Sequence, residues 1–127
     1  MSALPADPTS VSAARRFVAD QTDDLPTWVQ EALSVCVSEL ATNSVKHAGT
    51  PFTLRVVRTP SEVRVEVTDH DAALPRVRNP SVTDLRGRGL HIVEALSDDW
   101  GTEQADPPPG KTVWFVVRIG RDARERP

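Results

Sequence analysis

Cysteine is scarce in this chain of 127 residues, and tyrosine is absent. Because Cys36 is the single cysteine, no internal disulfide can form, and a structural thiol in a reducing cytoplasm is the expected state. No electropositive residue neighbours Cys36 in the sequence, which argues against a nucleophilic thiolate. The 3 histidines are scattered and show no zinc-binding spacing.

An excess of positive charge is lacking too. The 15 Lys and Arg residues are interspersed among 18 Asp and Glu, for a net charge of −3, so no electrostatic footprint for direct nucleic-acid binding is present. No apolar run approaches the roughly 20 residues of a membrane span, and the N-terminus lacks a signal-peptide core. We therefore expect a cytoplasmic protein without membrane contact, built as one domain.

A polar segment at the end of an apolar helix is the strongest functional signal. Apolar residues recur at three- and four-residue steps over residues 28–40, which predicts a helix that starts at Pro26 and ends near His47. The same steps lead to Glu39 and Asn43, so we expect a carboxylate and an amide on the inward face. Buried polar groups without partners cost about 1–3 kcal/mol each, which favours a ligand there. A solvated helix end is the alternative.

The other elements follow from alternation and from proline and glycine positions. Residues 52–59 and 62–69 alternate and predict an antiparallel hairpin. The remaining expectations are a short edge strand within residues 1–8, helices over 8–21 and 90–97, a loop over 70–86 and a last strand over 111–119. This order predicts an α+β two-layer sandwich over residues 4–119, with helices on one face of a mixed, mostly antiparallel sheet. The charged tail, residues 120–127, is expected to be disordered.

The residue types in the polar segment suit phosphate chemistry. Glu39 and Asn43 are four residues apart, so their side chains lie one turn from each other on one helix face. An Asn carbonyl oxygen is a suitable ligand for Mg²⁺, which takes much of its shell from phosphates and water. A carboxylate one turn away can orient or deprotonate an attacking hydroxyl.

Two further positions carry weaker signals. Asp69 ends an alternating strand, where its carboxylate can accept a hydrogen bond from an exocyclic amine such as that of adenine, although Asp also ends strands as a turn former. Residues 86–89, Arg-Gly-Arg-Gly, precede a predicted helix, where free backbone N–H groups and two arginines can hold phosphate. A plain helix-opening turn is the alternative for this segment.

A Walker A phosphate loop at Gly110-Lys111-Thr112 is excluded. That pattern requires glycine where Ala105 stands, and a helix after it, whereas the following residues predict a strand. We interpret these residues as a turn that leads into a core strand.

Taken in order, these segments resemble the Bergerat-fold ATPases, the group of gyrase, heat-shock chaperone, histidine kinase and mismatch-repair ATPases. More closely, the chain resembles the small ATP-binding regulators of the anti-sigma-factor serine/threonine kinase family. The resemblance covers residues 4–119 and four boxes. These are Glu39-Leu-Ala-Thr-Asn43-Ser-Val-Lys46-His47-Ala, Val-Thr-Asp69, Gly87-Arg88-Gly89-Leu90-His-Ile-Val and Gly110-Lys-Thr112-Val.

The resemblance implies a role for each matched position. It implies Glu39 as the base that activates a substrate hydroxyl and Asn43 as the Mg²⁺ ligand. It implies Asp69 as the residue that binds the adenine amine, with Thr112 supporting it. The other positions implied to contact ATP are Lys46, His47, Arg86, Gly87, Arg88, Gly89 and Leu90. In the family, a serine or threonine of an anti-anti-sigma partner of the STAS type is phosphorylated in competition with sigma-factor binding, and homodimers are common.

One departure from the family pattern leaves the function open. The Asp-x-Gly-x-Gly box appears here with Asp71 and Ala73 in place of its glycines. The side chain of Asp71 stands where backbone should approach the nucleotide. Two readings follow: an ATP-dependent serine/threonine kinase and anti-sigma switch, or a non-catalytic module on the same fold that regulates a partner by docking, with weak or no ATP turnover.

Overall fold

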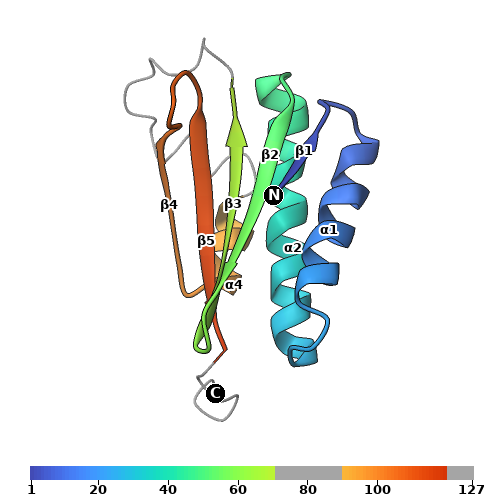
Figure 1. The fold of residues 1–127 in the computed structure, drawn as a ribbon, viewed down its shortest axis with the longest axis vertical. Helices are drawn as coiled ribbons and strands as arrows, with labels where there is room; N and C mark the ends of the chain where they lie inside the picture. Colours follow the sequence, from blue (N-terminus) through green and yellow to red (C-terminus); the bar gives the residue numbers. More distant parts are fainter. Residues whose placement is uncertain (71–89, 120–127) are drawn as a thin grey trace.

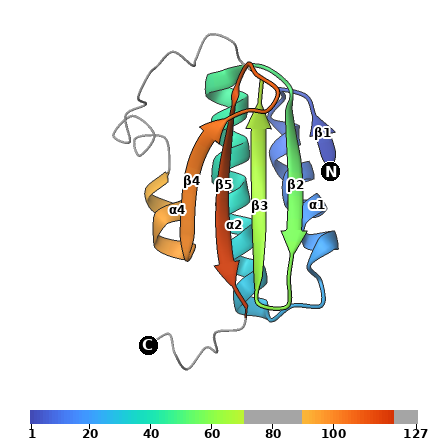
Figure 2. The same cartoon turned by 60° about the vertical axis from the view of Figure 1, so that its left-hand side comes forward.

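The computed structural model describes residues 1–70 and 90–119 and shows two layers. One layer is a sheet, and the other holds α1 (Thr9–Gln21), α2 (Thr27–Asn43) and α4 (His91–Leu96) (Figures 1 and 2). The strands are β1 (Ser2–Leu4), β2 (Phe52–Arg58), β3 (Glu62–Asp69), β4 (Asp99–Gln104) and β5 (Lys111–Arg118). The expected α+β sandwich is confirmed. None of the helices in these ranges is long and apolar enough to span a membrane.

The sheet is more regular than the sequence predicts. Its strands follow the order β1-β2-β3-β5-β4, and the four pairings are all antiparallel, so the mixed component expected of the sheet is not found among the described strands. Strand β4 was not predicted from the sequence. Its residues, Asp-Trp-Gly-Thr-Glu-Gln, lack the apolar–polar alternation of a half-buried strand. Strand β4 lies at the edge of the sheet and pairs with β5.

The two long helices begin within one residue of the positions predicted from the sequence. Before α1, the backbone N–H of Thr9 donates to Asp7 Oδ1 at 2.9 Å, which satisfies one free donor of the first turn. Helix α2 follows Pro26, and its last turn widens into the π-helical turn η1 (Ser44–Ala48). Gly49 then ends the helix with φ 68°, a left-handed conformation that glycine adopts at little cost.

The core lies between the layers. Alternate residues of β3 and β5 point toward the helices, and the apolar stripe of α2 covers them. The buried residues at this contact are Val63, Val65, Val67, Phe115 and Val117 of the sheet and Val29, Leu33, Cys36, Val37, Leu40 and Ala41 of α2. The opposite face of the sheet carries mostly polar side chains, together with Trp114, Val57 and Val116.

Candidate functional site

Three segments far apart in the sequence meet at one end of the molecule. They are the C-terminal end of α2 with η1, the end of β3 at Asp69, and the turn that joins β4 to β5 (Figure 1, upper end). The β2–β3 register places Asp69 opposite Phe52, the first residue of β2 after η1. The backbone N–H of His70 also donates to Thr50 Oγ1 at 3.3 Å. The hairpin therefore returns the end of β3 to the end of the long helix.

Glu39 and Asn43 lie on one flank of α2. At about 100° per residue, they point to the side opposite Gln30 and Ser34, which face α1. Figure 2 shows α4 and α1 on opposite sides of α2, so Glu39 and Asn43 lie on the flank nearer α4.

Both side chains are less enclosed than the sequence predicts. Glu39 and Asn43 are half-buried, and the buried stripe runs through Leu40 and Ala41 instead. The two side chains expected on the inward face thus lie at the margin of the buried stripe. Because solvent still reaches both side chains, water can satisfy their hydrogen-bonding groups without a ligand. The same exposure lets a ligand reach them.

Cys36 is a fully buried residue of α2, one turn before Glu39. Burial raises the pKa of its thiol to about 12, and the negative charge of Glu39 adds to this rise. The thiol is therefore protonated at neutral pH and unsuited to nucleophilic chemistry, which agrees with the structural role predicted from the sequence.

The π-helical turn holds the other polar residues of this segment. Lys46 is exposed, whereas Ser44 is buried, and the side chain of His47 lies outside what the structure describes. Short π-helical turns inside α-helices are frequent at functional sites because they reset the direction of the side chains that follow. Lys46 is thus free of the core and available to an anionic group.

Asp69 is a buried charged residue at this end of the molecule. Its side chain is 4% exposed, and Lys111 Nζ lies 2.8 Å from its Oδ2. An ionised carboxylate in such surroundings requires a charged or hydrogen-bonding partner, and Lys111 supplies one.

Thr112 is placed differently from the prediction. Its hydroxyl lies 2.7 Å from the hydroxyl of Thr68, directly across the β3–β5 ladder. Since side chains alternate along a strand, Thr68 and Thr112 face away from the helices, whereas Asp69 and Lys111 face toward them. The neighbouring residue, Lys111, is the one whose side chain contacts the Asp69 carboxylate.

The proposed phosphate segment falls mainly outside the described residues. Arg86, Gly87, Arg88 and Gly89 lie there, and so do Asp71 and Ala73. Leu90 is described, and its side chain is 1% exposed within the core at the start of α4. A role for Leu90 in ligand binding would thus fall to its backbone.

Gly110 and Lys111, predicted from the sequence only as a turn that leads into a core strand, contact the end of β3. Gly110 has φ 111°, and a Cβ there would collide with the carbonyl oxygen of Asp69 and lie 2.8 Å from His70 Cα. Only glycine lets the turn pack this closely against the end of β3. The available signal in the sequence was the Gly110-Lys111 pair at the start of β5. That strand pairs with β3, which ends at Asp69.

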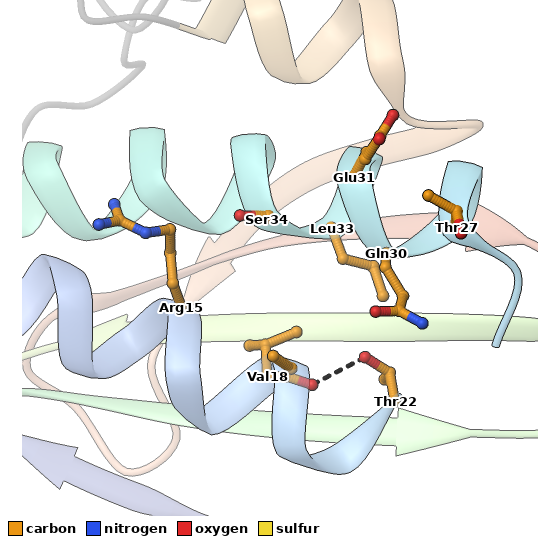
Figure 3. A pocket seen from close by; sticks show the side chains of 9 residues that line it. Arg15, Val18, Thr22, Thr27, Gln30, Glu31, Leu33 and Ser34 are labelled. Atoms are coloured by element: carbon orange, nitrogen blue, oxygen red, sulfur yellow. Dashed lines mark hydrogen bonds between the residues drawn. The ribbon is translucent and has the colours of Figure 1, made fainter. Parts of the chain in front are cut away.

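A cavity of about 270 Å³ lies elsewhere, between α1 and α2 (Figure 3). Its wall includes the Thr22 hydroxyl, which donates to the carbonyl oxygen of Val18 at 2.8 Å. The lining residues are Arg15, Val18, Ala19, Thr22, Thr27, Gln30, Glu31, Leu33 and Ser34. Because this cavity is on the α1 flank, it is separate from Glu39 and Asn43.

The fold and this end of the molecule define an ATPase-like α+β domain whose long helix ends in the Glu39–Asn43 segment beside a buried aspartate. Residues 4–117 match the family model described as the histidine kinase-like ATPase domain, and the chain belongs to that family. It is also 41% identical over 73 residues to the uncharacterized protein SCO4941 of Streptomyces coelicolor, a match that covers 54% of this chain and 70% of that protein.

Proposed function

We propose that this chain is an ATP-binding regulator of the anti-sigma serine/threonine kinase type. It would phosphorylate a serine or threonine of an anti-anti-sigma partner of the STAS type, sequester a sigma factor, or do both. The observation that carries the proposal is the placement of Glu39 and Asn43, one turn apart and half-buried, at the end of the molecule where Asp69 is buried. Family membership supports the ATP-binding part.

The donor set near Asn43 suits a magnesium ion bound together with phosphates. Among residues 1–70 and 90–119, no three His, Cys, Asp or Glu side chains form a cluster able to hold a metal ion. A single amide oxygen, that of Asn43, fits an ion that takes most of its ligands from a nucleotide and water. In this proposal Asn43 ligates Mg²⁺, Asp69 accepts the adenine amine, and exposed Lys46 meets phosphate.

Glu39 is suited to act on the hydroxyl of the partner. It is one turn before Asn43, and its carboxylate is accessible, so it can accept the proton of a serine or threonine that approaches along the α4 flank. ATP supplies the phosphoryl group when bound. Holding the hydroxyl and the phosphate in register is most of what such a site must do.

A non-catalytic docking module is the second candidate. The Lys111–Asp69 pair favours it, because the carboxylate expected to bind adenine already has a cationic partner at 2.8 Å. The loss of both glycines at positions 71 and 73 points the same way. In that case the fold would regulate a partner by contact alone.

Calorimetric titration with ATP, with and without Mg²⁺, tests the binding part. We expect saturable, Mg²⁺-dependent binding that Asn43→Ala loses. Gln30→Ala is the matched control. It removes a side-chain amide that lies on the opposite side of the same helix and donates a hydrogen bond to the Leu25 carbonyl oxygen. Equal ATP affinity of Asn43→Ala and the unaltered protein in Mg²⁺ would remove the metal assignment.

Transfer of phosphate from labelled ATP to a STAS-type protein tests the catalytic part. Glu39→Gln should bind ATP normally yet transfer no phosphate, because an amide cannot accept the hydroxyl proton. Transfer at the normal rate by Glu39→Gln would show that the base is wrongly assigned. ATP binding without transfer by the unaltered protein, together with nucleotide-independent partner binding, would favour the docking module.

A further inference from the structure

The contact between Lys111 and Asp69 joins two groups that are enclosed to different degrees. The Asp69 side chain is 4% exposed and that of Lys111 is 29% exposed, with 2.8 Å between Nζ and Oδ2. The carboxylate is thus fixed inside the layer contact, while part of the lysine stem remains at the surface. Of the two partners, the lysine is the one that can leave.

The backbone around Lys111 is held firmly on both sides. Gly110 packs against the Asp69 carbonyl, and its own carbonyl oxygen accepts a hydrogen bond from the Ala105 N–H at 3.0 Å. On the other side, the Thr112 hydroxyl lies 2.7 Å from that of Thr68. Removal of the ammonium group from Asp69 therefore needs only rotation of the lysine side chain.

The ammonium group of Lys111 makes the same kind of interaction that an adenine amine would make with Asp69. Both present N–H donors to a carboxylate oxygen, and the lysine donor also carries a full charge. A ligand amine that approaches the same carboxylate must displace the ammonium or share the carboxylate with it. Hydrogen bonds to charged groups are among the stronger contacts in proteins, so this competition weakens binding.

We propose that Lys111 is an intramolecular competitor for the nucleotide-binding carboxylate Asp69 and sets the nucleotide affinity of this protein. This inference rests on the proposed nucleotide-binding function. In it, nucleotide binding turns the Lys111 side chain out toward solvent, and nucleotide release returns it. Lys111 acts on affinity through Asp69 and takes no part in phosphate transfer.

Amine labelling of the unaltered chain tests the movement directly. The protein is treated briefly with an acetylating reagent, with and without saturating ATP and Mg²⁺, and acetylation is measured by peptide mass spectrometry. Lys111 should be acetylated several-fold faster with ATP, since its ammonium group is released from Asp69. The N-terminal amine of Met1, a residue 81% exposed, serves as the internal reference for reagent.

Substitution tests the effect on affinity. Lys111→Met keeps the stem but removes the charge, and we expect it to bind ATP about tenfold more tightly, a ratio that corresponds to about 1.4 kcal/mol. Lys111→Arg keeps the charge and should bind like the unaltered chain. Arg118→Met is the matched control, because it removes one positive charge from the other end of β5 and should leave affinity unchanged. Lys111→Gln replaces Lys111→Met if the latter does not fold.

The outcomes separate this inference from the proposed function. Faster acetylation and tighter binding support the competitor. Slower acetylation of Lys111 with ATP and weaker binding by Lys111→Met would overturn it and make Lys111 a direct nucleotide contact. ATP binding with no change in either measurement also overturns it, but spares the proposed function. Absence of ATP binding by the unaltered chain and by all three Lys111 variants overturns both.

Discussion

The inner and outer faces of the sheet both pair carboxylates with basic side chains, in very different surroundings. On the inner face, Lys111 Nζ lies 2.8 Å from Asp69, whose side chain is 4% exposed. On the outer face, Arg64 Nε lies at the same 2.8 Å from Glu66. The guanidinium group of Arg64 also lies over the Trp114 ring, 4.3 Å from its centroid. Distance alone therefore does not distinguish the two pairs.

Enclosure distinguishes them. The outer network also includes Arg55 and Glu103, both more than half exposed, and such surface pairs contribute about 0–1 kcal/mol each. The inner carboxylate is shielded by the helix layer, so loss of the Lys111 contact would remove a charged partner from a group with little access to water. Of the two carboxylates, Glu66 is 18% exposed and Asp69 is 4% exposed, so the inner charge is the more enclosed one and depends more on its protein partners.

The largest contrast is expected between the reactivity of the buried Cys36 thiol and that of a thiol at an exposed position. Because burial raises the pKa of Cys36 to about 12, about one thiol in ten thousand is ionised at pH 8. Iodoacetamide should therefore leave the native chain almost unmodified and react in urea. Ser61→Cys, in the exposed β2–β3 turn, should add one rapidly alkylated thiol. Alkylation of Cys36 in the native state at a comparable rate would contradict its burial in α2.

The second largest contrast is expected between the losses of stability caused by alanine substitutions on the two faces of β5. Phe115→Ala empties a fully buried position and should lower the free energy of unfolding by about 3–5 kcal/mol. Trp114→Ala, one residue away on the outer face, loses the contacts with Arg64 and Gly101 and should cost less than half as much. Urea denaturation measures both. Equal losses would mean that the outer face is as enclosed as the inner one.

The two faces should also differ in ATP affinity. Asp69→Asn removes the charged acceptor and should weaken binding by about 10–100-fold, as expected for a hydrogen bond of about 1.5–3 kcal/mol to a charged group. Glu66→Gln makes the same chemical change on the outer face and should leave the dissociation constant within about twofold. Calorimetric titration gives both values, and equal losses would place the ligand elsewhere.

The smallest effect is expected at the exposed Asp24–Arg58 pair. Hydrogen bonds from the Arg58 guanidinium group lower the pKa of Asp24. A carboxyl group whose pKa is lower in the folded state than in the unfolded state stabilises the fold at pH values above the unfolded-state pKa. This contribution is lost as the pH falls through the folded-state pKa. Asp24→Asn should thus lower the urea midpoint slightly at about pH 7 and not at about pH 2. A large shift would show that this surface pair is more enclosed than its exposure indicates.

Periodicity predicted most of the fold. The stripe of α2, the alternation of β2 and β3 and the apolar run of β5 each gave the correct element, because burial on one face imposes a repeat on the sequence. Strand β4 was missed for the same reason: it is an exposed edge strand without that repeat.

The candidate site was predicted less completely. The helical steps correctly place Glu39 and Asn43 on one flank, but they overstate the burial of both, because the stripe narrows toward Leu40 and Ala41. The family motif says nothing of which way Thr112 points. Its direction follows from the β3–β5 register, in which Thr112 lies opposite Thr68 on the outer face.

The sequence by itself determined the class of fold and the helix and hairpin that frame the candidate site. Those properties depend on local spacing, which repeats at 3.6 residues in helices and 2 in strands. Only the tertiary structure decided that Lys111, 42 residues after Asp69, is its partner. The reason is that the pairing depends on strand register and on a glycine turn packed against the end of β3, neither of which local spacing encodes.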